Sequence, residues 1–250
     1  MLLADNDRLL MHYARAVGIV VLDCLCTSFI NRVTMGLHMV VTITVRGPEW
    51  FFGLDSLFEG FAAIALLLIT LFSFKAYRFT KDKRYRTFAI AFGFMTLGMI
   101  GRILADFLVF IDVPVHPLLL LVSYAGYMGL TLVALILLFA LTVKVKQRAP
   151  VMALMLVSLV LVLLSASYRL SFHAISLILL IFITYQFVKN YFEKKSLTSL
   201  SVCASFGLLA LAQAAFITDI LRQKFYIVGH LIHLLAFALL FVALVKVVRR

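Results

Sequence analysis

The sequence predicts an all-α integral membrane protein, a bundle of seven transmembrane helices with the N-terminus outside and the C-terminus inside. Hydrophobic residues make up 64% of the chain and charged residues 14%, and the mean hydropathy of +1.12 lies far above that of water-soluble domains. The last 26 residues, Phe225–Arg250, show the plan that the chain repeats: an aromatic residue, an apolar run of about twenty residues and a basic end. The net charge of +12 indicates no nucleic-acid partner, because Lys and Arg lie between apolar runs and not on one soluble face.

The first fifty residues differ from the rest, and we expect residues 1–50 to be a loosely attached N-terminal extension. The apolar run Val17–Ile30 is short and carries Asp23, which is typical of a buried or interfacial element. It also resembles the hydrophobic region of a signal peptide, although no clear cleavage site follows. The next segment, Val40–Val45, alternates like a short strand.

Residues 51–250 are predicted to form one transmembrane domain. The seven spans are expected at about 51–74, 87–110, 118–143, 151–168, 171–188, 197–220 and 225–248. The fourth and fifth are short and are joined only by Arg169 and Leu170. No proline lies inside a span, so the helices should be straight, which disfavours the broken helices of many transporters. Five glycines on spans two and three are expected to allow close helix contact: Gly93, Gly98, Gly101, Gly126 and Gly129.

The basic residues predict the orientation. The connection Lys75–Arg86 holds six of them, and further lysines and arginines follow spans three, five and seven, whereas Ile111–Pro117 has none. By the positive-inside rule the C-terminus lies on the inner side of the cell membrane and the N-terminus on the outer side. The basic connections are then expected to bind anionic lipid headgroups, in preference to a docked protein.

Polar residues gather in the outer halves of the predicted spans. They form a candidate pocket of ten residues: Asp55, Glu59, Arg102, Asp106, Tyr124, Tyr127, Gln213, Asp219, His230 and His233. Ionisable groups inside a bilayer face a partner or a water-filled cavity, so we expect an outward-facing polar pocket above a largely apolar floor. Such a floor disfavours a channel or a pump, which needs polar groups along its whole depth.

Two features of this pocket suggest specific contacts. Asp55 and Glu59 share a helix face, where two carboxylates repel each other unless a cation or a proton intervenes. Arg102 is expected to form a structural ion pair with Asp106, four residues later, or with Glu59; the alternative is contact with a ligand.

His230 and His233 lie three residues apart on one helix face and could bind zinc, with a carboxylate or His116 as a third ligand. Packing against neighbouring spans is the favoured interpretation, and no cofactor is expected. Seven-helix zinc hydrolases of lipids and ceramides also carry a histidine pair on the last helix, but with three intervening residues. Their further Ser, Asp and His positions have no counterparts that can be placed in this sequence.

From about Leu54 onward the chain resembles uncharacterised seven-helix membrane proteins of archaea. The segments Asn190–Lys195 and Tyr226–Leu235 carry this resemblance. The layout is also similar to that of the seven-helix sensory domains that precede histidine kinases in prokaryotes. The resemblance implies a prokaryotic sensor that passes its signal to a separate signalling protein, and it assigns no catalytic residue.

Three functions follow as hypotheses. The first is a non-enzymatic, receptor-like or accessory membrane module with an outward-facing polar pocket. The second is a metal-dependent membrane hydrolase that uses His230 and His233. The third is a small-solute transporter.

Overall fold

The computed structural model of the chain describes residues 54–110, 117–143, 148–164, 168–219, 222 and 224–248. These residues form seven helices: α2 (Leu54–Thr80), α3 (Lys83–Phe110), α4 (Pro117–Val143), α5 (Arg148–Leu164), α6 (Tyr168–Lys194), α7 (Leu197–Thr218) and α8 (Lys224–Val248). Each coincides with one predicted span to within a few residues, except that α2 and α6 both end six residues later than predicted. The expected extension over residues 1–50 and the residue His116 lie outside the described part of the chain.

Six of the helices are long and apolar enough to cross a membrane, and α5, with 17 residues, is shorter. Their outward faces are apolar: on α2, Leu57, Phe61 and Ile64 are more than half exposed, whereas Asp55 and Glu59 on the opposite face are buried. A water-soluble helix would have the reverse arrangement, because its apolar face would be the buried one. The chain is therefore a multi-pass membrane protein, and the all-helical class is confirmed.

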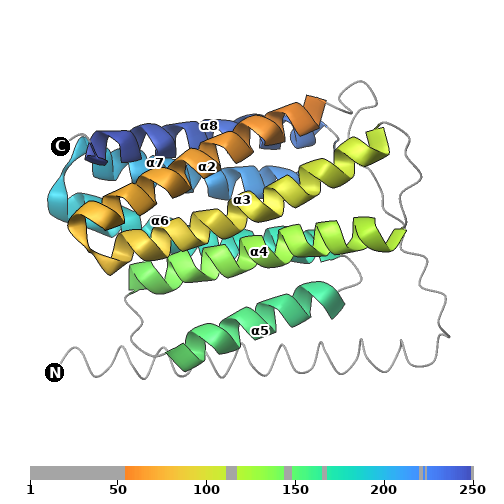
Figure 1. Cartoon of the computed structure of the whole chain (residues 1–250), viewed down its shortest axis with the longest axis horizontal. Coiled ribbons are helices and arrows are strands. Elements are labelled where there is room, and N and C mark those ends of the chain that lie inside the picture. The colour runs from red at the N-terminus through yellow and green to blue at the C-terminus, as the bar shows by residue number, and fades with distance from the viewer. Residues whose placement is uncertain are drawn as a thin grey trace. The chain divides into compact units, whose positions relative to one another are not determined.

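The six long helices form a closed ring. Each packs on the next in chain order, with α4 meeting α6 directly, and α8 returns to pack on α2. The short helix α5 packs on α4 and α6 from outside the ring and appears as the separate green helix in Figure 1. Around this ring α2 lies opposite α6, α3 opposite α7, and α4 opposite α8.

The two halves of the ring, α2–α4 and α6–α8, begin with the same kind of hairpin. Lys81 and Lys195 have left-handed φ angles of 57° and 47°, and each donates its backbone N–H to a tyrosine carbonyl four residues earlier, at 2.8 and 2.7 Å. This αL motif ends α2 and α6. The following residue caps the next helix at once: Asp82 accepts from Arg84 N–H at 2.9 Å, and Ser196 accepts from Ser199 N–H at 3.1 Å.

Packing within the halves also matches. A Cβ added at Gly93 would lie 3.6 Å from the Thr70 methyl group, and one added at Gly207 would lie 3.7 Å from the Thr184 methyl group. Counted from the two hairpin lysines, Thr70 corresponds to Thr184 and Gly93 to Gly207. The neighbouring Phe92 and Phe206 correspond in the same way, and both are fully buried.

The third helices of the halves end in similar sequences. Residues 134–148 read ALILLFALTVKVKQR and residues 236–250 read AFALLFVALVKVVRR, with eight of the fifteen positions identical. Ala134 and its counterpart Ala236 are both fully buried, as are Leu138 and Leu240 to within a few per cent. The ring therefore repeats one three-helix plan about an axis that runs along the bundle.

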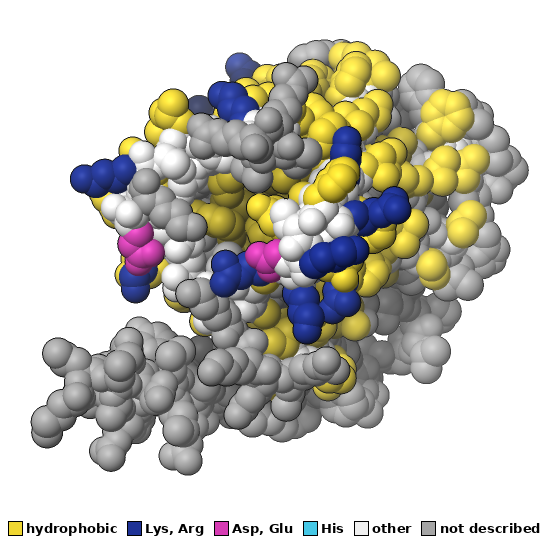
Figure 2. All heavy atoms as spheres, turned by 60° about the vertical axis from the view of Figure 1, so that its left-hand side comes forward, with side chains coloured by type: hydrophobic (Ala, Val, Ile, Leu, Met, Phe, Trp, Pro, Cys, Tyr) yellow, Lys and Arg dark blue, Asp and Glu magenta, His cyan; other side chains and the backbone are white. Residues whose placement is uncertain are grey.

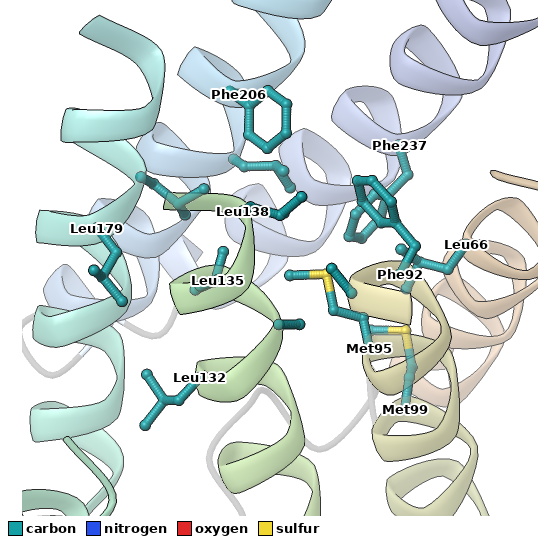
Figure 3. Packing of buried hydrophobic residues seen from close by; sticks show 14 of the residues in the cluster. Leu66, Phe92, Met95, Met99, Leu132, Leu135, Leu138, Leu179, Phe206 and Phe237 are labelled. Carbon is teal, nitrogen blue, oxygen red and sulfur yellow. The ribbon is translucent and has the colours of Figure 1, made fainter. Parts of the chain in front are cut away.

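The core lies inside this ring. Figure 3 shows Leu66, Phe92 and Met95 from the first half facing Phe206 and Phe237 from the second, with Leu135 and Leu138 of α4 between them. Small residues from each half, such as Ala91 and Ala236, are completely buried and let the helices approach. The apolar core fills the middle of the bundle and leaves the charged groups at its two ends.

Basic side chains gather at one end. Lys75, Arg78, Lys81, Lys83, Arg84, Arg86, Lys189, Lys195 and Lys246 are exposed there, with Asp82 and Glu193 among them. We call this the basic end; Figure 2 shows its Lys and Arg side chains beside apolar flanks. The opposite end, which holds Asp55, Asp106, Arg169 and Asp219, is called the polar end.

The glycine prediction is only partly confirmed. A Cβ at Gly98 would lie 3.3 Å from the Tyr127 backbone, and one at Gly129 would lie 3.4 Å from Leu159, so both permit close contact. Gly93 sits at ordinary contact distance from Thr70. The prediction is wrong for Gly101 and Gly126, which have nothing within 4 Å because they do not face a neighbouring helix closely.

Candidate functional site

The polar end is centred on Arg102 of α3. Its Nη2 lies 2.7 Å from Glu59 Oε1 on α2, and its Nε lies 3.5 Å from Asp106 Oδ2 one turn further along α3. The predicted ion pair is thus confirmed, with both proposed partners. Tyr124 of α4 donates a hydrogen bond to Asp106, and the guanidinium lies 5.0 Å from the centre of the Tyr127 ring. These contacts tie α2, α3 and α4 together.

A second ion pair joins the other half. Arg169 Nη2 lies 2.6 Å from Asp219 Oδ2, linking the first turn of α6 to the end of α7. Sequence reasoning placed Arg169 in a loop, because the fifth span was predicted to begin at residue 171. That placement is wrong, since α6 begins at Tyr168. The Arg169 guanidinium also lies 5.6 Å from the centre of the Tyr226 ring on α8.

The histidines lie between the two ion pairs. His230 Nδ1 is 3.9 Å from Glu59 Oε1, and His173 Nδ1 is 2.7 Å from Gln213 Oε1. The ring of Phe216 contacts the rings of His173, His230 and His233, with centroids 5.2, 5.1 and 6.2 Å away. On the α2 side, Tyr226 donates a hydrogen bond to Asp55 Oδ2 at 3.2 Å.

These groups enclose a cavity, which we call the polar cavity. It has about 20 Å³ of space for the centres of water molecules, enough for one or two of them. All six ring helices contribute to its lining: Glu59, Met99, Arg102, Tyr127, Arg169, His173, Phe216, Tyr226, His230 and His233. The side chain of Glu59 is 2% exposed, and its Oε2 has no hydrogen-bond partner among the described residues.

A second cavity of similar size adjoins the first towards the middle of the bundle. We call it the apolar cavity; Met99, Tyr127 and His233 line both. Its other lining residues are mostly aliphatic: Leu66, Met95, Thr131, Leu135, Leu180, Leu209, Gln213 and Phe237. Figure 3 shows Met95 and Met99 side by side on α3 in this region.

The structure brings all ten predicted pocket residues to the same end of the bundle, but not to one cavity. Glu59, Arg102, Tyr127, His230 and His233 line the polar cavity, and Gln213 lines the apolar one. The other four lie behind the lining: Asp55, Asp106 and Asp219 bind lining residues, and Tyr124 binds Asp106. Arg169, His173 and Tyr226 line the cavity and were missing from the prediction.

The zinc hypothesis receives no support from the described residues, among which no group of three or more His, Cys, Asp and Glu could hold a metal ion. His230 points towards Glu59, whereas His233 lies over the ring of Phe237 with centroids 4.6 Å apart. The third candidate ligand, His116, lies outside the described part of the chain.

Comparison of the chain with protein-family models, with curated proteins and with solved structures found no match.

Proposed function

We propose that the protein is a seven-helix, receptor-like module of the cell membrane that binds a small polar ligand in the polar cavity. The unpartnered Glu59 Oε2 carries this proposal. A buried carboxylate oxygen without a donor is costly in a bilayer, and water or a ligand with a donor group relieves that cost.

The position of the cavity suits a receptor. Each of the six ring helices supplies a lining side chain, so a ligand that contacts them all favours one arrangement of the helices over another. The apolar core below contains no further charged lining residue, which supports binding without passage. The altered arrangement would be read at the basic end by a separate signalling protein.

The orientation proposal places the polar end outside and the basic end inside. Seven crossings are supported by the direction of the helices. Both α4 and α6 begin at the polar end, since Tyr124 and Arg169 lie near their first residues. The chain must return from the basic end between them, and the 17 residues of α5 cover about 26 Å, close to the roughly 30 Å of the hydrocarbon core.

A small-solute transporter is the second candidate, and the repeated halves favour it. Transporters with parallel repeats bind their substrate between the repeats and expose it by rocking one against the other. The polar cavity lies between α2–α4 and α6–α8.

Ligand binding and solute flux separate these candidates. In the first experiment the purified protein is heated with each member of a panel of amino acids, amines, carboxylates, sugars and inorganic salts. We expect at least one solute to raise the melting temperature of the parent and not of Glu59→Gln, because binding to the folded state stabilises it. The proposal fails if no solute does so.

In the second experiment liposomes containing the protein are loaded with the stabilising solute. If the protein is a receptor, the solute should leave these liposomes at the same rate as it leaves liposomes without the protein. Release that requires the protein and is lost in Glu59→Gln would make it a transporter.

A further inference from the structure

Matched positions on α2 and α6 differ in charge at the polar end, where Arg102 of α3 adds a guanidinium beside Glu59 in the lining of the polar cavity. Counted from the hairpin lysines Lys81 and Lys195, Asp55 on α2 corresponds to Arg169 on α6, and Glu59 corresponds to His173. Because α2 and α6 lie opposite each other in the ring, the cavity has a carboxylate on one wall and a guanidinium on the other.

We infer that the ligand is a compact zwitterion, a small α-amino acid with a short apolar side chain. This inference rests on the proposed function and specifies its ligand. The ammonium group would meet Glu59, the carboxylate would meet Arg169, and the side chain would enter the apolar cavity.

The ammonium side is argued from Glu59 and its neighbours. Glu59 and Asp106 share the single guanidinium of Arg102, so two carboxyl groups face one cation. Glu59 lines the cavity, and its Oε2 lacks a donor among the described residues. The rings of Tyr127 and Tyr226, which also line the cavity, attract a cation.

The carboxylate side is argued from Arg169. A guanidinium has five N–H donors, and Nη2 is the atom of Arg169 that contacts Asp219. The residue lines the cavity and is 30% exposed, so donors remain for a second carboxylate, a group that arginine binds through two parallel hydrogen bonds.

The apolar cavity determines the polarity and the size of the ligand's side chain. It shares Met99, Tyr127 and His233 with the polar cavity, so a group attached to the zwitterion would extend towards the leucines and methionines of the neighbouring cavity. Methionine side chains adapt to the shape of a guest. Since each cavity holds only one or two water molecules, the side chain is short, as in alanine or valine, and the lining side chains have to move apart to admit the whole ligand.

A singly charged ligand fits less well. An anion would leave Glu59 Oε2 without a donor, and a cation would face the guanidinium of Arg169. Among charged ligands, one that carries both charges can pair with Glu59 and with Arg169 at the same time.

Titration calorimetry with L-valine and its two truncated analogues tests the inference. Isobutylamine lacks the carboxylate of valine, and isovalerate lacks the ammonium group. We expect valine to bind at least tenfold more tightly than either analogue, and glycine to bind more weakly than valine. Equal affinity for isobutylamine or for isovalerate would overturn the zwitterion, and equal affinity for glycine would overturn the role of the apolar cavity.

Variants assign each charge to its wall. Glu59→Gln should lower the affinity for valine and for isobutylamine at least tenfold and leave the affinity for isovalerate unchanged. Arg169→Gln should weaken valine and isovalerate and leave isobutylamine unchanged. Since Arg169→Gln leaves Asp219 buried without its guanidinium, the double variant Arg169→Gln, Asp219→Asn removes both charges of the pair and should give the same ligand pattern. The exposed Arg222→Gln serves as the control and should change nothing.

Failure of the inference is distinct from failure of the proposed function. If amino acids do not bind but another solute of the panel stabilises the parent and not Glu59→Gln, the zwitterion is wrong and the receptor proposal stands. If no solute of the panel binds, both are wrong.

Discussion

Arg102 links three helices at the polar end. It contacts a carboxylate on its own helix, a carboxylate on α2 and the ring of a tyrosine on α4, and it is 18% exposed. In a bilayer little water is available to solvate such a charge, so the position of the side chain is set by the groups that it contacts. The same contacts fix the rotation of three helices about their axes.

Arg102→Leu should therefore be strongly destabilising. It leaves Glu59 and Asp106 without their shared cation, and removing one member of a buried ion pair costs about 3 to 5 kcal/mol. Thermal unfolding in detergent measures the effect. Arg84→Leu, at the exposed basic end, is the matched control and should shift the melting temperature little. Equal stability of Arg102→Leu and the parent would show that Arg102 is solvated.

The end of the bundle at which these residues lie was predictable, but rotation about the helix axis was not. Arg102 and Asp106 are one turn apart, and a charge inside a span requires a partner, so their pairing followed from spacing alone. Arg169 was missed because an apolar window cannot locate the first turn of a helix to within two residues. That Tyr226 and His173 would face the same cavity as Glu59 depends on packing between helices distant in the chain.

At the scale of the helix, Gly229 marks the tightest contact of α8. A Cβ built there would lie 2.6 Å from Cε1 of Phe216, whose ring also touches His173 and His230. The glycine was not among those predicted to allow close contact, because glycines inside an apolar run look alike in the sequence. The contact at Gly229 is tight because the ring of Phe216 on α7 lies against it.

Gly229→Ala should destabilise the protein by about 1 to 3 kcal/mol, the usual cost of overpacking, because the buried Phe216 ring has to move. Gly101→Ala, where nothing lies within 4 Å, should be neutral or slightly stabilising, since alanine favours helix. Unfolding midpoints of both variants in detergent test this contrast. A smaller cost at Gly229 than at Gly101 would contradict the described packing.

The turn between α2 and α3 offers a test of lipid contact. Replacing Lys83 and Arg84 by glutamine should weaken retention of anionic lipid by about 2 kcal/mol, because each basic residue near the surface contributes about 1 kcal/mol. The control replaces Arg222 and Lys224, at the polar end, and should have no comparable effect. Native mass spectrometry of both variants with anionic and zwitterionic lipids gives the comparison; equal losses would contradict a specific role for the basic end.

At the scale of the whole molecule, the six helices long enough to span a membrane are those that form the ring, and the shorter α5 packs outside it. The spans and their order were predictable from apolar runs, and so was the all-helical class. The direct contact of α4 with α6, which leaves α5 outside, was not, because hydropathy does not encode which helices are neighbours. The likeness of the two halves also depends on packing, because it shows in the matching contacts of Gly93 and Gly207 with threonine methyl groups.

The topology has a direct test. Single cysteines introduced at Val145 and Ala166, on either side of α5, are treated with a membrane-impermeant reagent on intact cells. With seven crossings the cysteine at 166 should react and that at 145 should not. A tag at the C-terminus should be cytoplasmic and one within Val113–Pro117 external. Reaction at neither or at both of the cysteine positions would exclude a crossing by α5, and reversed tags would invert the orientation.

The position of α5 outside the ring has a consequence for how such a chain can originate. A unit of three spans begins and ends on opposite sides of the membrane, so a tandem fusion of two copies of its gene would insert the second copy upside down. One extra crossing between the copies restores the common orientation. In this view the short helix α5 is the segment that would supply this crossing between the two halves.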